Sequence, residues 1–212
     1  SLNPADISSA LTVYPKNSRN ASSAVPKNQM KSALLLIDLQ QDFLASADLQ
    51  PSAPALVARA GELLRTCRER QIPVIHVWTT VDREKNRRLP HWRALNRWMC
   101  VAGTPGHETP KNLRPLSGET IVHKTGFNPF ATGELEKILR AAGCDSVILS
   151  GLHLHACVRA AAVESLERDL RVVIAEDAVA NNDPVHAAAT RRWLAARCVS
   201  FESTGALFNH SN

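Results

Sequence analysis

The sequence predicts a three-layer α/β/α fold built on a six-stranded, mainly parallel β-sheet. From residue 33 onwards, short and continuous apolar runs alternate with longer segments of helical periodicity. Strands that are apolar along their whole length are typical of parallel sheets, which are buried on both faces. Alternating strands and helices favour helices on both sides of such a sheet. A chain of 212 residues is long enough for one domain of this kind.

The first 30 residues differ from the rest in composition. They are rich in Ser, Asn and Pro, which predicts a flexible N-terminal arm over residues 1–30 and a folded domain over 31–212. The arm has no charged start followed by an apolar core, so we do not interpret it as a secretory signal. The chain does not begin with Met, which suggests processing or excision from a longer chain.

In the first half of the domain, strands flank one long helix. The apolar run 33–37 predicts a buried strand, and the run 73–78 predicts a second one. Between them, residues 54–70 place Leu56, Leu63 and Cys67 on one face, which predicts an amphipathic helix. The irregular stretch 79–119, with a short helix expected around 92–98, is long enough to suggest a functional loop.

The second half continues the alternation. Residues 120–123 predict a third strand that ends at Lys124, and Gly143 can cap a helix over 134–142. A strand over 147–149, a helix over 156–168 and a strand over 171–175 follow. Asp183 and Pro184 have the residue types of an N-cap and a first helical turn, so a helix is expected from there to about residue 196. Residues 198–201 predict the sixth strand.

Composition argues against two classes of partner. No apolar run approaches the roughly 20 residues that span a membrane. The net charge of +5 and pI of 9.2 invite a nucleic-acid interpretation. However, the densest basic run, 83–88, contains an acidic residue and no interleaved aromatics, so we interpret it as a solvated loop. We therefore expect a small-molecule substrate, no nucleic acid and no membrane.

The cysteines indicate a reducing environment. There are five, they are scattered, and no two are spaced as a CxxC pair. This pattern argues against a disulfide framework and against a zinc ribbon, and it favours a cytoplasmic protein.

Three residues with reactive or ionisable side chains lie at or after the ends of predicted strands. Asp38 follows the first strand, Lys124 the third, and Cys157 the fourth after a short loop. Because ligands bind beyond the carboxyl ends of parallel strands, we expect these side chains to converge on one crevice. Each also has a simpler interpretation, as a loop cap, a solvated lysine or a small core residue.

Together the three residues would suit nucleophilic catalysis. Cys157 is expected near the positive end of a helix, a setting that lowers the pKa of a thiol. Asp38 could accept the thiol proton, and Lys124 could stabilise the thiolate. The N–H groups of Cys157 and of the loop before it are suitable donors to an oxyanion. Asp38 could then protonate a leaving amine and activate water.

The motifs of the chain resemble those of the isochorismatase-like cysteine hydrolases, which include nicotinamidases, N-carbamoylsarcosine and biuret amidohydrolases, and isochorismatases. Residues 34–43 match the opening pattern hhhhDhQxDF, in which h is hydrophobic, and residues 103–106 match a common loop. Lys124 and Phe130 match KxxxxxF, residues 151–158 match GxxTxxCV, and residues 176–178 with His186 match the DA…H tail. These matches follow the family's order over about residues 32–205.

The resemblance implies a Rossmann-like fold with Asp38 as base, Lys124 as charge partner and Cys157 as nucleophile. It also implies a cis peptide bond before His153, which would direct the backbone N–H of His153, with that of Cys157, at the oxyanion. The implied activity is hydrolysis of a small carboxamide, carbamoyl or ureido compound through a thioester. The implied assembly is a homodimer or homotetramer, and no cofactor is expected.

The chain departs from the family pattern in two places. Leu154 stands where the pattern has Thr, so a hydroxyl is missing. The Asp-x-His pair of the nicotinamidase metal site is absent from residues 77–84, after the second strand. His153 and His155 form an HxH pair, but no third ligand is evident, so we interpret them as pocket-lining or structural residues. We therefore expect no metal.

Aromatic residues near the expected crevice are candidates for the substrate pocket. The candidates are Phe43, Trp78, Trp92, Phe127 and Phe130, together with Leu154. A core role is an equal alternative for Phe130 and a favoured one for Phe43.

The sequence leaves two other functions open. Isochorismatase-type vinyl-ether hydrolysis would need Asp38 and Lys124 but no thiol. A non-catalytic binding domain is supported by the departure at Leu154 and by the N-terminal arm.

Overall fold

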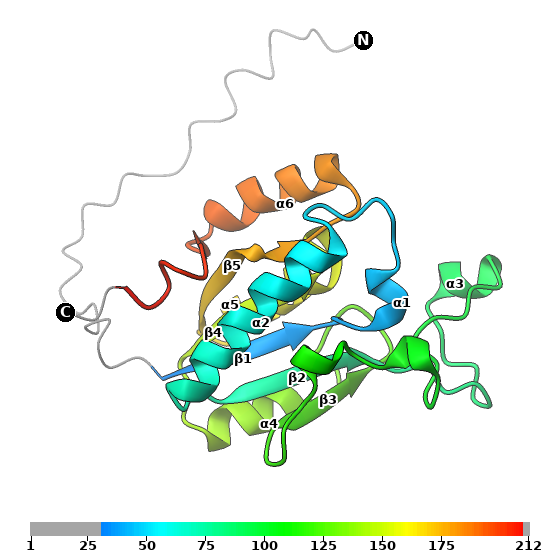
Figure 1. Ribbon diagram of the computed structural model, residues 1–212, viewed down its shortest axis with the longest axis horizontal. Helices are drawn as coiled ribbons and strands as arrows, with labels where there is room; N and C mark the ends of the chain where they lie inside the picture. The colour runs from blue at the N-terminus through cyan, green and yellow to red at the C-terminus, as the bar shows by residue number, and fades with distance from the viewer. Residues whose placement is uncertain (1–30, 210–212) are drawn as a thin grey trace, which may run out of the picture.

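The computed structural model describes residues 31–209 and has the predicted three-layer α/β/α architecture (Figure 1). Its single sheet has the strand order β3-β2-β1-β4-β5-β6, and every pairing is parallel. The strands are β1 (Ser32–Ile37), β2 (Val74–Thr79), β3 (Thr120–Lys124), β4 (Ser146–Leu152), β5 (Arg171–Ala180) and β6 (Ser200–Glu202). The fold prediction is confirmed, whereas the arm expected over residues 1–30 lies outside the described residues.

Helices cover both faces of the sheet (Figure 1). One face packs against α4 (Glu134–Ala141), α5 (Arg159–Leu166) and α6 (Pro184–Ala195). The other face packs mainly against α2 (Ala53–Glu69), with α1 (Gln41–Leu44) and α3 (Pro90–Ala94) nearer the carboxyl ends of the strands. Short 3₁₀ turns, η3 (Pro105–His107) and η4 (Lys111–Leu113), lie in the segment before β3.

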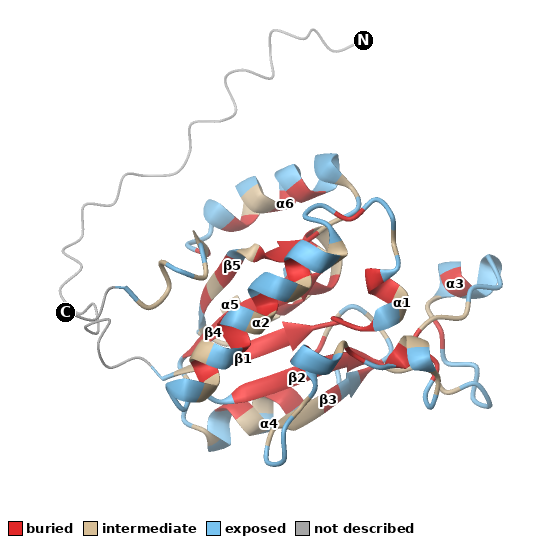
Figure 2. Cartoon of the chain, in the orientation of Figure 1, coloured by how far each residue is buried: buried red, intermediate tan, exposed pale blue. Residues whose placement is uncertain are grey.

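The central strands are buried on both faces, as their apolar sequences predict (Figure 2). In β1, Leu35 and Ile37 belong to the core beneath α4 and α5, whereas Leu34 and Leu36 belong to the core beneath α2. This division follows from the two-residue period of a strand. A strand with no solvated face cannot carry alternating polar residues, so after Ser32 at its start the next polar residue is Asp38, directly beyond its carboxyl end.

Several boundaries differ from those expected. Strand β5 continues to residue 180, because its register shifts against β4 between Leu149 and Gly151 and pairing resumes beyond the polar residues 176 and 177. The hydroxyl of Ser150 donates to the carbonyl of Ala178 (2.7 Å) within this irregularity. Sequence periodicity also missed α1, which is only one turn long, and placed α3 two to four residues too late.

The end of the long segment before β3 is held by an ionic cluster. Arg68 of α2 makes a bidentate pair with Glu119 (2.7 and 2.8 Å), and His76 of β2 lies 2.9 Å from the same carboxylate. Burial alone would raise the pKa of Glu119, but hydrogen bonds from Arg68, Leu116 and His76 outweigh it and lower the pKa to about 2. This cluster ties α2 and β2 to the start of β3, at the edge of the sheet.

Over residues 31–209, the helices are too short or too polar to cross a lipid bilayer.

Truncating the centre of the sheet should destabilise the protein. Leu149 of β4 is fully buried in the core beneath α4 and α5, so Leu149→Ala should lower the free energy of unfolding by about 3 kcal/mol. The control is Leu95→Ala, because Leu95 is 72% exposed and its loss should cost less than about 0.5 kcal/mol. Urea denaturation measures both; equal losses would contradict the assignment of the core.

Candidate active site

The carboxyl ends of β1, β3 and β4 bring the three predicted residues together. Asp38 directly follows β1, Lys124 is the last residue of β3, and Cys157 lies in a π-helical turn, η5 (Leu154–Val158), after β4. The ammonium of Lys124 donates to Asp38 Oδ2 (2.8 Å) and lies 3.4 Å from the sulfur of Cys157. All three side chains are buried, with Asp38 1% and Lys124 4% exposed. The predicted convergence at the strand ends is therefore present in the structure.

Thr79, the last residue of β2, completes this cluster. Its hydroxyl donates to Asp38 Oδ1 (2.8 Å) and accepts from the ammonium of Lys124 (2.7 Å). Its backbone N–H also donates to Asp38 Oδ1 (3.0 Å), while Gly126 supplies a carbonyl to Lys124 (3.0 Å). The carboxylate and the ammonium thus have several partners each, which is what buried charges require.

A buried glutamine connects the cluster to the long segment between β2 and β3. The side chain of Gln40 accepts from the N–H of Thr79 (2.9 Å) and donates to the carbonyls of Thr79 (2.9 Å) and His107 (2.8 Å). Gln40 is fully buried. It therefore fixes the end of β2, and with it the hydroxyl of Thr79, against η3.

The loop before Cys157 depends on a glycine. Gly151 has φ +127°, and a Cβ there would lie 2.0 Å from the carbonyl oxygen of Ile37. Only glycine allows β4 to pass so close to the end of β1. Shortly after it, the peptide bond Leu152–His153 is cis, as the family resemblance implies.

The backbone hydrogen bonds of this loop are irregular around Cys157. The carbonyl of His153 accepts from the N–H groups of Ala156 (2.9 Å) and Val158 (3.3 Å). The N–H of Cys157, which lies between those two donors in the chain, does not donate to this carbonyl. The arrangement suits an N–H that donates to a bound group rather than to the helix.

The electrostatics of the thiol differ from the prediction. Burial and the neighbouring Asp38 raise the pKa of Cys157, and the opposing effect of Lys124 does not outweigh them. The expectation of a lowered thiol pKa at a helix end is therefore wrong, because a buried position beside a carboxylate disfavours the thiolate. The free thiol keeps its proton at neutral pH.

Lys124 keeps its charge in this environment. Burial alone would lower the pKa of its ammonium, but Asp38 and Cys157 reverse that effect and raise it. A protonated lysine beside a neutral thiol is ready to stabilise a thiolate as soon as the proton leaves the sulfur.

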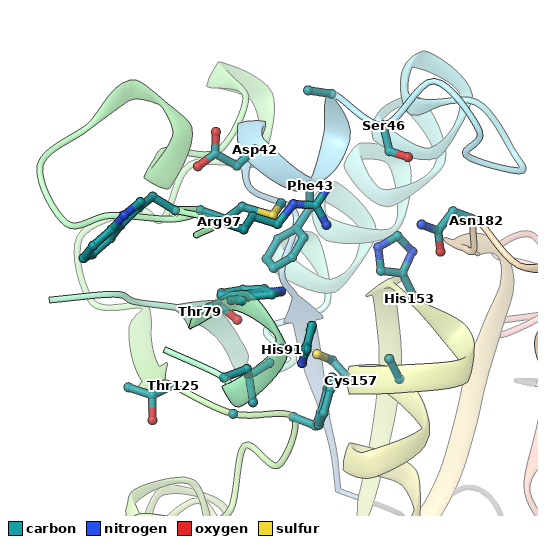
Figure 3. Close-up of a pocket in the computed structure, with 18 of the residues that line it drawn as sticks. Asp42, Phe43, Ser46, Thr79, His91, Arg97, Thr125, His153, Cys157 and Asn182 are labelled. Carbon is teal, nitrogen blue, oxygen red and sulfur yellow. The ribbon is translucent and has the colours of Figure 1, made fainter. Parts of the chain in front are cut away.

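A cavity of about 540 Å³ opens above the sulfur of Cys157. Figure 3 shows Phe43, His91, His153 and Cys157 around it, contributed by α1, α3 and the loop after β4. Three of the six predicted pocket residues line this cavity, namely Phe43, Trp92 and Phe127. Phe43 and Trp92 pack against each other with their ring centroids 6.2 Å apart.

The other three predicted pocket residues do not line this cavity. Phe130 and Leu154 point into the core beneath α4 and α5, where they are 3% and 7% exposed. Trp78 packs edge-on against His107 and His123 instead. Trp78 points away from the cavity because side chains alternate along β2, whereas the turn at Phe130 and the first residue of η5, Leu154, direct their side chains into the core. Leu154 replaces a hydroxyl with an apolar group that is buried in the core.

Sequence patterns missed several residues of the site. Thr79 lies at the end of an apolar strand, where a threonine gives no signal of its own, although its position is equivalent to those of Asp38 and Lys124. His91 and Arg97 line the cavity from the long segment between β2 and β3, whose path no periodicity predicts.

The two histidines of the HxH pair lie side by side, with ring centroids 5.6 Å apart. Burial and the neighbouring His155 lower the pKa of His153 to about 4, so its imidazole is neutral. Both Nδ1 atoms are buried without a hydrogen-bond partner in the described part of the chain. His153 packs edge-on against Phe43, so its side chain forms part of the cavity wall.

The residues present do not fit the metal site of the nicotinamidases. After β2, Asp82 accepts hydrogen bonds from the N–H groups of Glu84 and Lys85 (3.0 and 3.1 Å), and no histidine follows it at the required spacing. Between residues 31 and 209, no three His, Cys, Asp or Glu side chains are placed to hold a metal ion together.

Comparison with known proteins agrees with these motifs. The family model described as the isochorismatase domain matches residues 32–204. Among curated proteins, maleamate amidohydrolase from Pseudomonas putida is 28% identical over 166 residues, which cover 73% of this chain and 75% of that protein.

Solved structures agree in fold as well. An isochorismatase family protein from Desulfovibrio vulgaris is 30% identical with a TM-score of 0.75, over 85% of this chain and 97% of that one. N-carbamoylsarcosine amidase from Thermoplasma acidophilum is 29% identical with a TM-score of 0.71, over 84% of this chain and 99% of that one.

Removing the carboxylate of Asp38 should make the thiol of Cys157 easier to ionise. The negative charge of Asp38 opposes thiolate formation while Lys124 favours it, so Asp38→Asn should lower the pKa of Cys157. The rate of its alkylation by iodoacetamide at pH 7 should rise at least about tenfold, because lowering the pKa by one unit raises the thiolate fraction about tenfold. Mass spectrometry measures the rate, with exposed Cys198 as the internal reference. An unchanged pH profile of alkylation would contradict this account of the thiol.

Proposed function

The chain belongs to the isochorismatase family and is a hydrolase of C–N amide bonds, and we propose that it acts through a covalent thioester on Cys157. The proposed substrates are small carboxamide, carbamoyl or ureido compounds. The observation that carries this proposal is the buried contact of Lys124 with both Asp38 (2.8 Å) and the sulfur of Cys157 (3.4 Å), at the floor of an open cavity. In this proposal, Asp38, Lys124 and Cys157 are the catalytic residues.

In the first half of the reaction, the proton of the thiol is transferred to the leaving nitrogen through Asp38. Asp38 accepts that proton as the sulfur attacks the carbonyl carbon, and Lys124 stabilises the developing negative charge on sulfur. The carbonyl oxygen becomes an oxyanion, to which the N–H groups of His153 and Cys157 donate. Asp38 then returns the proton to the leaving nitrogen as the C–N bond breaks. Ammonia or an amine departs, and a thioester remains on Cys157.

The second half releases the acid. Asp38, again a carboxylate, accepts a proton from water as the water oxygen attacks the thioester carbonyl. The tetrahedral intermediate collapses by breaking its C–S bond, and the thiolate takes the proton from Asp38. The raised pKa of the resting thiol fits this cycle. The thiol is neutral between turnovers and becomes nucleophilic only as its proton moves to Asp38.

The geometry favours this reaction over the two alternatives. Vinyl-ether hydrolysis would use Asp38 and Lys124 but would leave the sulfur idle, although the sulfur faces both the ammonium and the cavity. A binding domain would have no need for a buried carboxylate and ammonium, each of which costs free energy to desolvate. Inhibition of hydrolysis by a thiol alkylator would separate the amidohydrolase from the vinyl-ether hydrolase.

We also propose a reducing, cytoplasmic setting and a homodimer or homotetramer. The five free cysteines, Cys157 among them, suit a reducing compartment. Light scattering at several concentrations tests the assembly.

Loss of the sulfur should abolish turnover. Cys157→Ala should lower kcat for ammonia release from the best substrate by at least about 1000-fold, because both covalent steps need the sulfur. Cys144→Ala is the matched control, since Cys144 is a half-buried thiol that does not line the cavity. In the native enzyme, rapid quench and mass spectrometry should trap an acyl group on Cys157. Full activity of Cys157→Ala would rule out the mechanism.

Thr79 should matter through its hydroxyl. Thr79→Val keeps the shape but leaves both Asp38 and Lys124 without one partner, so kcat should fall by roughly 10- to 100-fold. Thr79→Ser restores the hydroxyl and should recover most of that loss. The pH profile of kcat/KM should shift in Thr79→Val and not in Thr79→Ser. If the two variants behaved alike, the hydroxyl would have no such role.

A further inference from the structure

Apart from its histidines, the wall of the cavity contains two ionisable side chains of opposite charge, Asp42 and Arg97. Their surroundings differ. Asp42 belongs to α1, next to Phe43, and Arg97 belongs to the segment after α3. Figure 3 shows both side chains near the mouth of the cavity, above the ring of Phe43.

The carboxylate of Asp42 contacts the backbone of the loop that contains Cys100 and Gly106. Its Oδ2 accepts from the N–H of Cys100 (2.6 Å). Its Oδ1 lies so close to Gly106 that a Cβ there would approach it to 2.1 Å. In Figure 3 the carboxylate points away from the ring of Phe43, toward that loop. Asp42 therefore has a structural role, and within residues 31–209 it forms no ion pair with Arg97.

In contrast to the carboxylate of Asp42, the guanidinium of Arg97 makes no hydrogen bond or ion pair within the described residues. Its backbone is held on both sides, because its N–H donates to the carbonyl of Trp92 (2.7 Å) and its carbonyl accepts from Arg88 (2.9 Å). Its guanidinium, in contrast, has no carboxylate within ion-pair distance anywhere in residues 31–209. The side chain extends over the cavity toward Phe43 (Figure 3). Because no carboxylate pairs with it, this guanidinium is available to bind an anion at the mouth of the cavity.

The other groups near the sulfur do not form an ion pair with Arg97. The half-buried imidazole of His153 is neutral, since burial and His155 lower its pKa to about 4. The negative charge of Asp38, below the sulfur, is paired with Lys124 at 2.8 Å. Between the sulfur and Arg97, the wall includes the aromatic rings of Phe43 and Trp92 and, among the described residues, carries no carboxylate other than Asp42. The cavity thus has the thiol of Cys157 at one end, aromatic rings along its wall and the guanidinium of Arg97 near its mouth.

We propose that Arg97 determines specificity by binding the carboxylate of a short acid amide, whose carbonyl carbon is attacked by Cys157. The substrate class is a compound with an amide, carbamoyl or ureido group at one end and a carboxylate at the other, joined by a short hydrocarbon spacer. This proposal rests on the proposed function, since Cys157 must be the nucleophile. The planar guanidinium can donate two parallel hydrogen bonds to a carboxylate, which fixes the orientation of the substrate as well as attracting it.

The first experiment compares matched substrates. Succinamate and its neutral analogue 4-oxopentanamide differ by the replacement of a carboxylate with a methyl ketone, and ammonia release gives kcat/KM for each. The native enzyme should prefer succinamate, and Arg97→Gln should reduce that preference by about tenfold or more, chiefly through KM. Arg87→Gln is the control, because Arg87 is an exposed arginine of the same loop that does not line the cavity. It should leave the preference unchanged.

The second experiment does not require turnover. N-iodoacetylglycine and N-iodoacetylglycinamide are alkylators that differ only in a carboxylate and a carboxamide. The ratio of their rates at Cys157, divided by the same ratio at exposed Cys198, should be high in the native protein. It should fall about tenfold in Arg97→Gln but not in Arg87→Gln.

The outcomes separate this proposal from the proposed function. Equal preference ratios in the native protein and in Arg97→Gln, in either experiment, would overturn the role of Arg97 and leave the cysteine mechanism intact. Full hydrolysis by Cys157→Ala would overturn the mechanism itself. If the native enzyme hydrolysed neither amide, the alkylation ratio alone would decide whether Arg97 binds a carboxylate.

Discussion

The arrangement of this crevice depends on the buried ion pair between Asp38 and Lys124. Both side chains are almost completely inaccessible, and they are 2.8 Å apart. Breaking a buried pair by removing one partner typically costs about 3–5 kcal/mol, because the remaining charge is left without compensation. The hydroxyl and N–H of Thr79 and the carbonyl of Gly126 satisfy the remaining donors and acceptors of the pair. These hydrogen bonds hold the carboxyl ends of β1, β2 and β3 next to one another.

The same pair sets the chemistry available to the sulfur. Burial and Asp38 hold the thiol in its neutral form, while Lys124 remains charged beside it. A neutral resting thiol is protected from indiscriminate oxidation and alkylation, since the thiolate is the reactive form. The sulfur therefore needs a base for every turnover, and in the proposed mechanism Asp38 is that base. The helix end that precedes α5 contributes less to the pKa of Cys157 than burial and the two charges at strand ends, Asp38 and Lys124.

Glycines make this close packing possible. Gly151 lets β4 pass against the carbonyl of Ile37, and Gly106 leaves room for the carboxylate of Asp42. The first contact positions the loop that carries His153 and Cys157. The second holds the long segment between β2 and β3 against α1. That segment in turn supplies Trp92 and Arg97 to the cavity wall, so the proposed specificity depends on contacts made far from the sulfur.

The sequence by itself determined the layers, the six strands and the convergence of Asp38, Lys124 and Cys157. Apolar runs and helix caps are local features that can be read from the sequence. The meeting of parallel strand ends at one edge of the sheet follows from the topology. Tertiary structure alone decided the protonation of Cys157, since burial and the distance to Asp38 oppose the local effect of a helix end. It also decided which aromatic residues face the cavity: Trp92 does, whereas Phe130 turns into the core. Thr79 and Arg97 became visible only in the folded chain, because their roles depend on partners that lie far away in the sequence or on the absence of a nearby carboxylate in the described residues.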